Sequence, residues 1–165
     1  DLGDLSVRVT LDEQAGTLTI SDRGIVNGYL FGGRNPSKDV IHQVECIDEA
    51  ISDHITRERF TVDRQMRLST FHVNDMESLF DLNTGRTFEH IGYMATSIKE
   101  GGIDVDGEDR IATRILVPPG SAGVYVEPIT QHPGEYEILL PRGRTLRFEG
   151  LGASDGRPIV YLRLL

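Results

Sequence analysis

The chain has little cysteine and a shortage of positive charge. Cys46 is the only cysteine among the 165 residues, which excludes an internal disulfide framework and a metal site built from several cysteines. Seventeen Lys and Arg residues face 26 Asp and Glu residues, so the net charge is −9. Proteins that hold nucleic acid by its phosphates, or dock on anionic membrane surfaces, need clustered cations. We therefore expect neither nucleic acid nor a membrane as a partner.

Long apolar runs and a targeting signal are missing too. No run approaches the roughly 20 apolar residues that a membrane helix needs. The chain opens with Asp1 and Asp4, where a signal peptide would have a basic start and an apolar stretch, and it lacks an initiator methionine. With 38% hydrophobic residues, the chain can build a core. We expect residues 1–165 to form one domain, excised from a longer protein.

Apolar periodicity predicts a helix in the first half of the chain. Apolar residues recur at three- and four-residue intervals from Val40 to Ile55, which indicates a helix from about residue 38 to 56. Before it, alternation over residues 5–10 predicts a short strand or extended arm, and the apolar run at 24–31 predicts the start of another helix.

The second half of the chain has the pattern of short strands separated by turns. Pro-Pro-Gly at 118–120, His-Pro-Gly at 132–134 and Asp-Gly at 155–156 are typical turn sequences. A helix followed by strands indicates an α+β fold with a mostly antiparallel sheet or sandwich. Besides one helical turn at 76–82, we predict strands at residues 60–64, 91–98, 113–117, 123–127, 135–140, 145–149 and 159–164.

Common motifs for metal, phosphate or nucleophile chemistry are absent. The five histidines are scattered, without a His-x-x-x-His pair or a cysteine partner, so we expect solvated or core histidines and no metal. The acidic run at 104–109 has its glycine at the fourth position, where an EF-hand needs it at the sixth, which indicates a solvated loop. No phosphate loop, dinucleotide fingerprint or nucleophile elbow is present.

One pair of carboxylates stands out. Glu135-Tyr136-Glu137 follows a His-Pro-Gly turn and opens the apolar strand at 138–140. In an extended strand both glutamates point to the same face, where like charges repel each other. Such costly arrangements occur more often at functional sites. Taken alone, the pair is more often explained by a solvated face of an edge strand.

One stretch, at 117–143, and three segments upstream of it resemble the bacterial ADP-ribosyltransferase exoenzyme family, and their order along the chain agrees with that of the family. Val-Pro-Pro-Gly at 117–120 leads to a Gly-Val-Tyr strand, and Gly-Glu-Tyr-Glu-Ile-Leu-Leu-Pro-Arg-Gly at 134–143 is similar to the family's Glu-x-Glu strand and the turn after it. Gly-Tyr-Met-Ala-Thr-Ser at 92–97 resembles its Gly-Phe-x-Ser-Thr-Ser motif. Residues 60–64 resemble the strand that ends in the family's Tyr-Arg, and 25–30 resemble its Ile-Asn-x-x-Leu-Arg helix.

The resemblance spans roughly residues 14–165 and implies both a fold and an activity. The implied fold is a split β-sandwich of two antiparallel sheets with N-terminal helices and an NAD cleft between the sheets. The implied activity is mono-ADP-ribosyl transfer, in which NAD is the substrate, nicotinamide leaves and a side chain of a target protein receives ADP-ribose. Glu instead of Gln at position 135 resembles the arginine-modifying branch of the family.

The family's main functional roles fall on three residues of this chain. Glu137 would bind the nicotinamide-ribose hydroxyls and stabilise the oxocarbenium ion formed as nicotinamide leaves, which suits a carboxylate beside a developing cation. Glu135 would orient or deprotonate the acceptor, as a general base can. Arg64 would contact the NAD phosphate, for which a guanidinium is well shaped.

Further residues are implied to bind NAD or to border it. Thr96 and Ser97 would brace the cleft and the catalytic glutamate. Residues 128–134 would form a mobile loop that meets the target, and 99–110 the loop over the phosphates and nicotinamide. The remaining cofactor-binding positions implied by the family are Gln65, Asn27 and Arg34.

The chain departs from the family pattern at several of these places. Ala95 replaces the first Ser of Ser-Thr-Ser, which removes a hydroxyl expected to hold the catalytic glutamate. Asp63 stands where the family has Tyr before its arginine, and Gln65 where Gly is common. Arg67 is close enough in sequence to compete with Arg64 as the phosphate ligand.

Three functions remain open at this level. The first is a transferase that acts as a bacterial or phage toxin or effector, is secreted or delivered into a target cell, and works in its cytoplasm. Its partners would be the target protein and an immunity protein or larger delivery chain. The second is an NAD glycohydrolase, in which water replaces the acceptor and Glu135 is not needed. The third is a non-catalytic binding module, which Ala95 and Asp63 favour.

Overall fold

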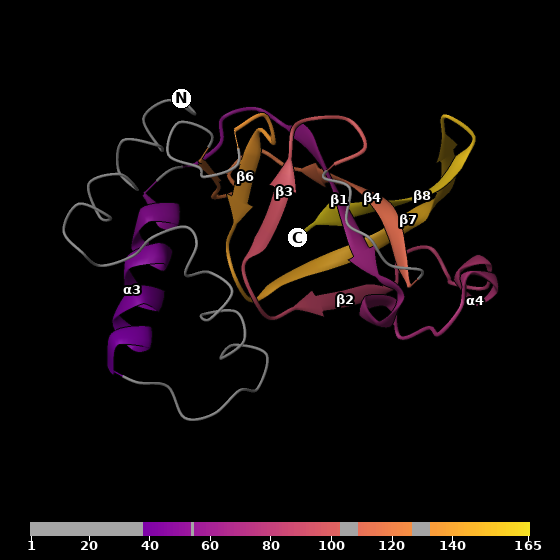
Figure 1. Cartoon of the computed structure of the whole chain (residues 1–165), viewed down its shortest axis with the longest axis horizontal. Helices are drawn as coiled ribbons and strands as arrows, with labels where there is room; N and C mark the ends of the chain where they lie inside the picture. The colour runs from indigo at the N-terminus through magenta and orange to yellow at the C-terminus, as the bar shows by residue number, and fades with distance from the viewer. Residues whose placement is uncertain (1–37, 54, 103–108, 127–132) are drawn as a thin grey trace.

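The computed structural model describes four stretches of the chain (Figure 1), residues 38–53, 55–102, 109–126 and 133–165. The strand predicted at 5–10 and the helix predicted at 24–31 lie outside the described residues. Parts of the two expected loops, 103–108 and 128–132, lie outside them as well.

The first described element is α3 (Lys38–Ser52), which confirms the predicted helix. Its buried side chains recur at three- and four-residue intervals, as one face of a helix requires: Val44, Ile47, Ala50 and Ile51. The helix ends before the predicted residue 56 because the chain turns to pair with a later segment. Ile55 forms a bridge with Ala122, and the Thr56 N–H donates to the Ser121 carbonyl oxygen at 2.8 Å.

Two short helical segments follow β1 (Phe60–Arg67), namely η2 (Leu68–Phe71) and α4 (Met76–Phe80). The second confirms the helical turn predicted at 76–82. It begins after Asp75, whose carboxylate accepts a hydrogen bond from the Ser78 N–H at 2.8 Å. In Figure 1, α4 lies at the opposite end of the molecule from α3.

The strands predicted from residue 60 onward all have counterparts, and one further strand was missed. This is β2 (Thr87–His90), whose alternation covers only four residues and is too short to stand out in the sequence. The remaining strands are β3 (Met94–Ser97), β4 (Arg110–Val117), β5 (Val124–Tyr125), β6 (Glu137–Leu140), β7 (Arg144–Ser154) and β8 (Arg157–Leu164).

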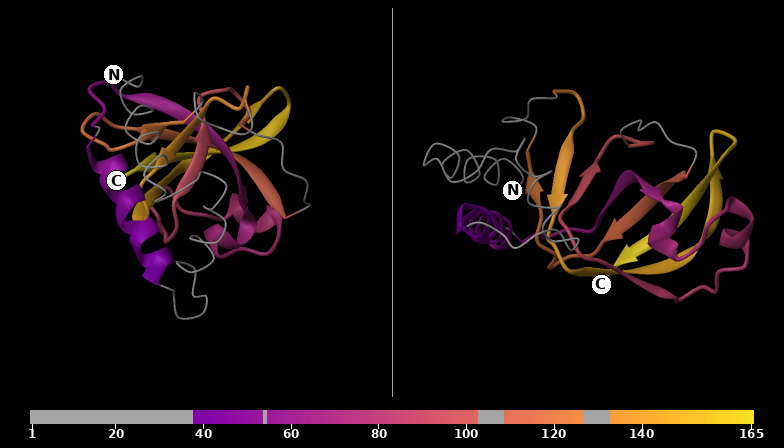
Figure 2. Two further views of the ribbon diagram at one scale, coloured as in Figure 1. Left: turned by 60° about the vertical axis from the view of Figure 1, so that its left-hand side comes forward. Right: turned by 60° about the horizontal axis from the view of Figure 1, so that its bottom comes forward.

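The strands form one hydrogen-bonded order, β2-β7-β8-β4-β1-β3-β6-β5. A single residue pair, Asp63 with Ser97, joins β1 to β3, so the order divides into a large half of five strands and a small half of three. Figures 1 and 2 show the small half running steeply across the long β7–β8 hairpin. Neighbouring strands pair antiparallel, with the exception of β4 and β8, which are parallel. β8 is the second strand of the β7–β8 hairpin and runs in the same direction as β4.

The main core lies between the two halves. Val62, Ile115 and Leu162 of the large half pack in one cluster with Met94, Ile138 and Leu140 of the small half. A second cluster joins α3 to the other face of the small half, through Tyr93, Val124 and Leu139. The expected α+β split sandwich is therefore confirmed, with its two sheets linked at one pair and one parallel contact among their strands.

Candidate functional site

The site is built where the two halves of the sheet meet. Glu137 of β6 pairs with Ser97 of β3, Ser97 pairs with Asp63 of β1, and Asp63 pairs with Arg114 of β4. These four residues form one row across the sheet. At the usual spacing of strands, the Cα atoms of Glu137 and Asp63 are about 10 Å apart. Four sequence segments far apart in the chain are thus brought together, and Arg64 follows Asp63 in β1.

Thr96 and Ser97 hold the backbone of the glutamate segment. The Thr96 hydroxyl donates to the Ile138 carbonyl oxygen at 2.7 Å, and the Ser97 hydroxyl donates to the Glu135 carbonyl oxygen. Ser97 Oγ also accepts a hydrogen bond from the Lys99 N–H at 3.0 Å. Thr96 and Ser97 are both buried. The geometry therefore supports a bracing role, exerted through the backbone of residues 135–138.

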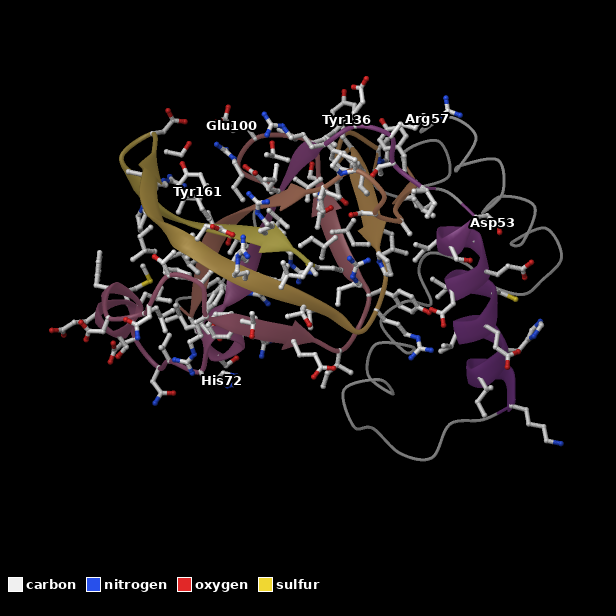
Figure 3. All side chains as sticks on the ribbon, turned by 180° about the vertical axis from the view of Figure 1, so that it is seen from behind. Asp53, Arg57, His72, Glu100, Tyr136 and Tyr161 are labelled. Atoms are coloured by element: carbon white, nitrogen blue, oxygen red, sulfur yellow. The ribbon has the colours of Figure 1, made fainter. Side chains whose placement is uncertain are left out.

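The two glutamates do not lie on one regular strand, which corrects the argument from alternation. β6 begins at Glu137, and Tyr136 has a left-handed backbone with φ of 48°. A residue in that conformation breaks the period of two that would align Glu135 with Glu137. Glu137 is 2% exposed, whereas Glu135 is half-buried and Tyr136 is 45% exposed. Tyr136 lies on the upper edge of the molecule in Figure 3.

Arg64 lies on the face of β1 that packs toward the core. Its Nε atom is inaccessible to solvent and has no hydrogen-bond partner in the part of the chain that the structure describes. Burial, and then the nearby charge of Arg110, lower the pKa of Arg64 to about 10, while the charge of Glu137 acts in the opposite direction. Arg64 and Glu137 are therefore close enough for each to feel the other's charge.

A cleft of about 500 Å³ opens beside Arg64. Its wall contains Arg67, His90, Tyr93 and Arg110, whereas Glu135 and Glu137 are not among its described lining residues. Arg67 is thus near enough to remain an alternative phosphate ligand.

His90 belongs to this cleft and was not singled out by the sequence. Its Nδ1 lies 2.9 Å from the Gly92 carbonyl oxygen, which fits a neutral ring that donates from this nitrogen. Burial, followed by the charge of Arg64, lowers the pKa of His90 to about 4. His90 is buried, which agrees with the second of the two expectations for the histidines, a core histidine. Its place just before the segment at 92–97 was the only signal that it borders the site.

Gln65 lies on the other side of the sheet from Arg64. Successive residues of a strand point to opposite faces, and Gln65 lines a separate cavity of about 510 Å³ together with Arg110 and Arg114. The structure therefore does not bring Gln65 into the cleft beside Arg64. Asn27 and Arg34 lie outside the described residues.

Two of the departures from the family pattern, Ala95 and Asp63, have structural explanations. Ala95 packs against the cluster between α3 and the small half of the sheet, opposite Leu139. The Asp63 carboxylate is buried and accepts hydrogen bonds from Arg114 Nε and Nη2, each at 2.9 Å, and from the Gly101 N–H at 2.7 Å. Both residues are thus integrated into the fold.

No group of three or more His, Cys, Asp or Glu side chains within the described stretches could hold a metal ion. Among the helices that the structure describes, none has the length and apolar character to span a membrane.

The chain is similar in sequence or structure to several known bacterial and phage proteins. Mono-ADP-ribosyltransferase C3 of Clostridium botulinum D phage is 27% identical over 155 residues, which cover 84% of this chain and 58% of that protein. An ADP-ribosylating toxin, BECa, of a binary enterotoxin of C. perfringens has a similar structure, with a TM-score of 0.71 and 20% identity over 96% of this chain and 42% of that one. C3stau2 from S. aureus, solved with NAD, has a TM-score of 0.66 and 19% identity over 100% of this chain and 96% of that one.

The chain spans little more than half the length of the curated relative from the D phage. The structural likenesses, all at low identity, establish the fold. The sequence model of the ADP-ribosyltransferase exoenzymes matches residues 17–159, nearly the whole chain. The chain therefore belongs to the ADP-ribosyltransferase exoenzyme family.

Proposed function

We propose that the domain is an NAD-dependent mono-ADP-ribosyltransferase that modifies a side chain of a target protein. The observation that carries this proposal is the junction of the two halves of the sheet. There Glu137, Ser97 and the residue before Arg64 lie in one row, and the charge of Glu137 reaches Arg64. One carboxylate and one cation, both largely withdrawn from water, suit a substrate that is an anion at its phosphates and becomes cationic at its ribose.

Arg64 would hold the phosphates of NAD. Its Nε atom lacks a hydrogen-bond partner among the described residues, in a place that water does not reach. A buried donor without a partner is costly, and a ligand oxygen would satisfy it. The bound NAD of C3stau2 is consistent with NAD as the substrate here.

Glu137 would act on the bond between ribose and nicotinamide. NAD supplies an electrophilic ribose carbon once nicotinamide leaves. The carboxylate of Glu137, in a site with little water, would stabilise the positive charge that develops on the ribose. The Ser97 and Thr96 hydrogen bonds fix the backbone of this segment, so the carboxylate would be held in place before the reaction.

Glu135 would act on the acceptor. It is more accessible than Glu137 and lies beside the exposed Tyr136, on the side where a target would approach. A carboxylate there can orient and deprotonate an incoming nucleophile. We propose arginine as the acceptor, because a second glutamate pairs well with a guanidinium.

We further propose that the domain works inside a target cell after delivery as part of a larger protein. BECa belongs to a binary enterotoxin, and there the match covers 42% of that chain. An immunity protein remains a prediction.

Labelled NAD, incubated with the domain and a cell lysate, tests this function. We expect label on a small number of lysate proteins, and mass spectrometry should locate it on arginine. The variant Glu135→Gln should lose labelling but still release nicotinamide. If the wild type releases nicotinamide and labels nothing, the domain is an NAD glycohydrolase. If it does neither, the non-catalytic binding module is the better description.

A further inference from the structure

We propose that Asp63 is a positioning residue that fixes the turn at 98–102 onto the backbone of Arg64. This inference rests on the proposed function, in which Arg64 binds NAD. The turn leads directly into residues 103–108, and it starts at the Ser97 end of the row that contains Glu137. Asp63 would thereby set the spacing between the residue that binds phosphate and the residue that acts on the ribose.

The Asp63 carboxylate joins three segments of the chain. It lies on β1 and accepts hydrogen bonds from Nε and Nη2 of Arg114, which is on β4. It also accepts a hydrogen bond from the Gly101 N–H in the turn. The side chain of Asp63 is only 6% exposed, so these are hydrogen bonds of a buried charge. Such bonds are stronger and more directional than those of exposed ion pairs.

A second, weaker arm reaches the turn from the same arginine. Arg114 Nη2 also donates to Glu100 Oε1 at 3.1 Å, but the Glu100 side chain is 73% exposed. Figure 3 shows Glu100 on the upper edge, toward solvent. Asp63 and Glu100 therefore hold the same turn from the buried and the exposed side, and the buried contact should dominate.

The turn is pressed closely against Arg64. Gly102 has φ of 69°, and a Cβ atom on it would stand 3.1 Å from the Arg64 Cα and 3.3 Å from its amide nitrogen. The turn is closed by the Gly102 N–H, which donates to the Lys99 carbonyl oxygen at 3.0 Å. At its other end, Ser97 Oγ accepts from the Lys99 N–H and donates to the Glu135 carbonyl oxygen. A continuous set of contacts thus runs from Arg64 through the turn to the glutamate segment.

The variant Asp63→Asn tests this role, because it keeps the shape and removes the charge. We expect the NAD dissociation constant and KM to rise about tenfold, as when a supporting partner of a functional group is lost, with kcat changed by less than about threefold. Hydrogen exchange of the amides at 98–102 should become faster. The matched control is Glu100→Gln, which removes the negative charge from the exposed arm only and should behave as the wild type.

Several results would overturn the inference. Unchanged exchange at 98–102 and unchanged NAD affinity in Asp63→Asn would do so, as would an equal effect of Glu100→Gln. A parallel fall of kcat and kcat/KM in step with the folded fraction would indicate a purely structural role. Should Asp63→Asn fail to fold, the double variant Asp63→Asn/Arg114→Gln removes the buried carboxylate together with the guanidinium that pairs with it, so that neither charge is left without its partner, and the same outcomes are expected. If the wild type binds no NAD, the proposed function fails. Hydrogen exchange at 98–102 in Asp63→Asn then still shows whether Asp63 fixes this turn.

Discussion

The guanidinium of Arg64 combines burial, an Nε atom without a partner among the described residues, and a nearby carboxylate in Glu137. A purely structural arginine in the core would be expected to satisfy its donors within the protein. The sequence singled out Arg64 only through the family resemblance, since nothing in its neighbours announces burial. The structure adds the reason that it suits a ligand.

Replacing Arg64 by lysine should weaken NAD binding by about tenfold or more. Lysine lacks the planar fork for phosphate, and burial disfavours the charged form of its ammonium group more strongly than that of a guanidinium. Calorimetric titration with NAD measures this. The matched control is Arg67→Lys in the same cleft, which should bind within about twofold of the wild type. The opposite ranking of the two variants would make Arg67 the phosphate ligand.

His90 should make the stability of the domain depend on acidity. Burial, and to a smaller extent the charge of Arg64, lower its pKa to about 4. The histidine of the unfolded chain is therefore protonated near pH 6.5, whereas that of the folded protein stays neutral until the pH is much lower. Stability is therefore complete above about pH 6.5 and falls as the pH drops toward 4, by about 2 kcal/mol between pH 7 and pH 5.

Urea unfolding at pH 7 and pH 5 checks this dependence on His90. The variant His90→Asn should lose less stability than the wild type over the same interval, by about 2 kcal/mol. Equal losses in the two proteins would show that other groups account for the acid sensitivity.

At the scale of elements, α3 is attached to the small half of the sheet by one polar network as well as by apolar packing. The Tyr93 hydroxyl lies 2.5 Å from Asp48 Oδ1 and 3.1 Å from the Val44 carbonyl oxygen. Arg142, just after β6, pairs with Asp48 at 2.9 Å. Burial and the hydrogen bond to Asp48 raise the pKa of Tyr93, so it remains a donor at any physiological pH.

Tyr93→Phe should reduce the free energy of unfolding by about 1 kcal/mol, because a hydrogen bond is lost while the ring stays packed. Thermal or urea unfolding measures this change. Arg142→Gln breaks the half-exposed ion pair with Asp48 and should cost less, within about 1 kcal/mol. A larger loss from Arg142→Gln than from Tyr93→Phe would contradict this description of the network.

Sequence patterns predicted the helices and strands well where the apolar residues recur with the period of the helix or strand. α3 and most strands appear as expected, because their apolar residues face a core. The Glu-x-Glu segment was placed on a regular strand, and this was wrong, since Tyr136 takes a left-handed backbone. That conformation depends on hydrogen bonds from Ser97 and Ile98, which are distant in sequence, so local alternation could not reveal it.

At the scale of the whole molecule, the site depends on a single junction between two halves of a sheet. The family motifs named the candidate site residues, whereas no pattern along the chain predicted that Asp63 and Ser97 would be the joining pair. The contribution of Asp63 was hidden for the same reason, because its partners Arg114 and Gly101 are 51 and 38 residues away. A net charge of −9 does not by itself locate the arginines that lie beside this junction, which are Arg64, Arg67 and Arg110.

Nicotinamide release from NAD by the purified domain and its Glu137→Gln variant is the most direct test of the central claim. Release is common to transfer and to hydrolysis, so the result does not depend on knowing the acceptor. We expect the wild type to release nicotinamide and the variant to be at least roughly 100-fold slower, with an unchanged melting temperature. A wild type that leaves NAD intact, or a Glu137→Gln variant as fast as the wild type, would contradict the account.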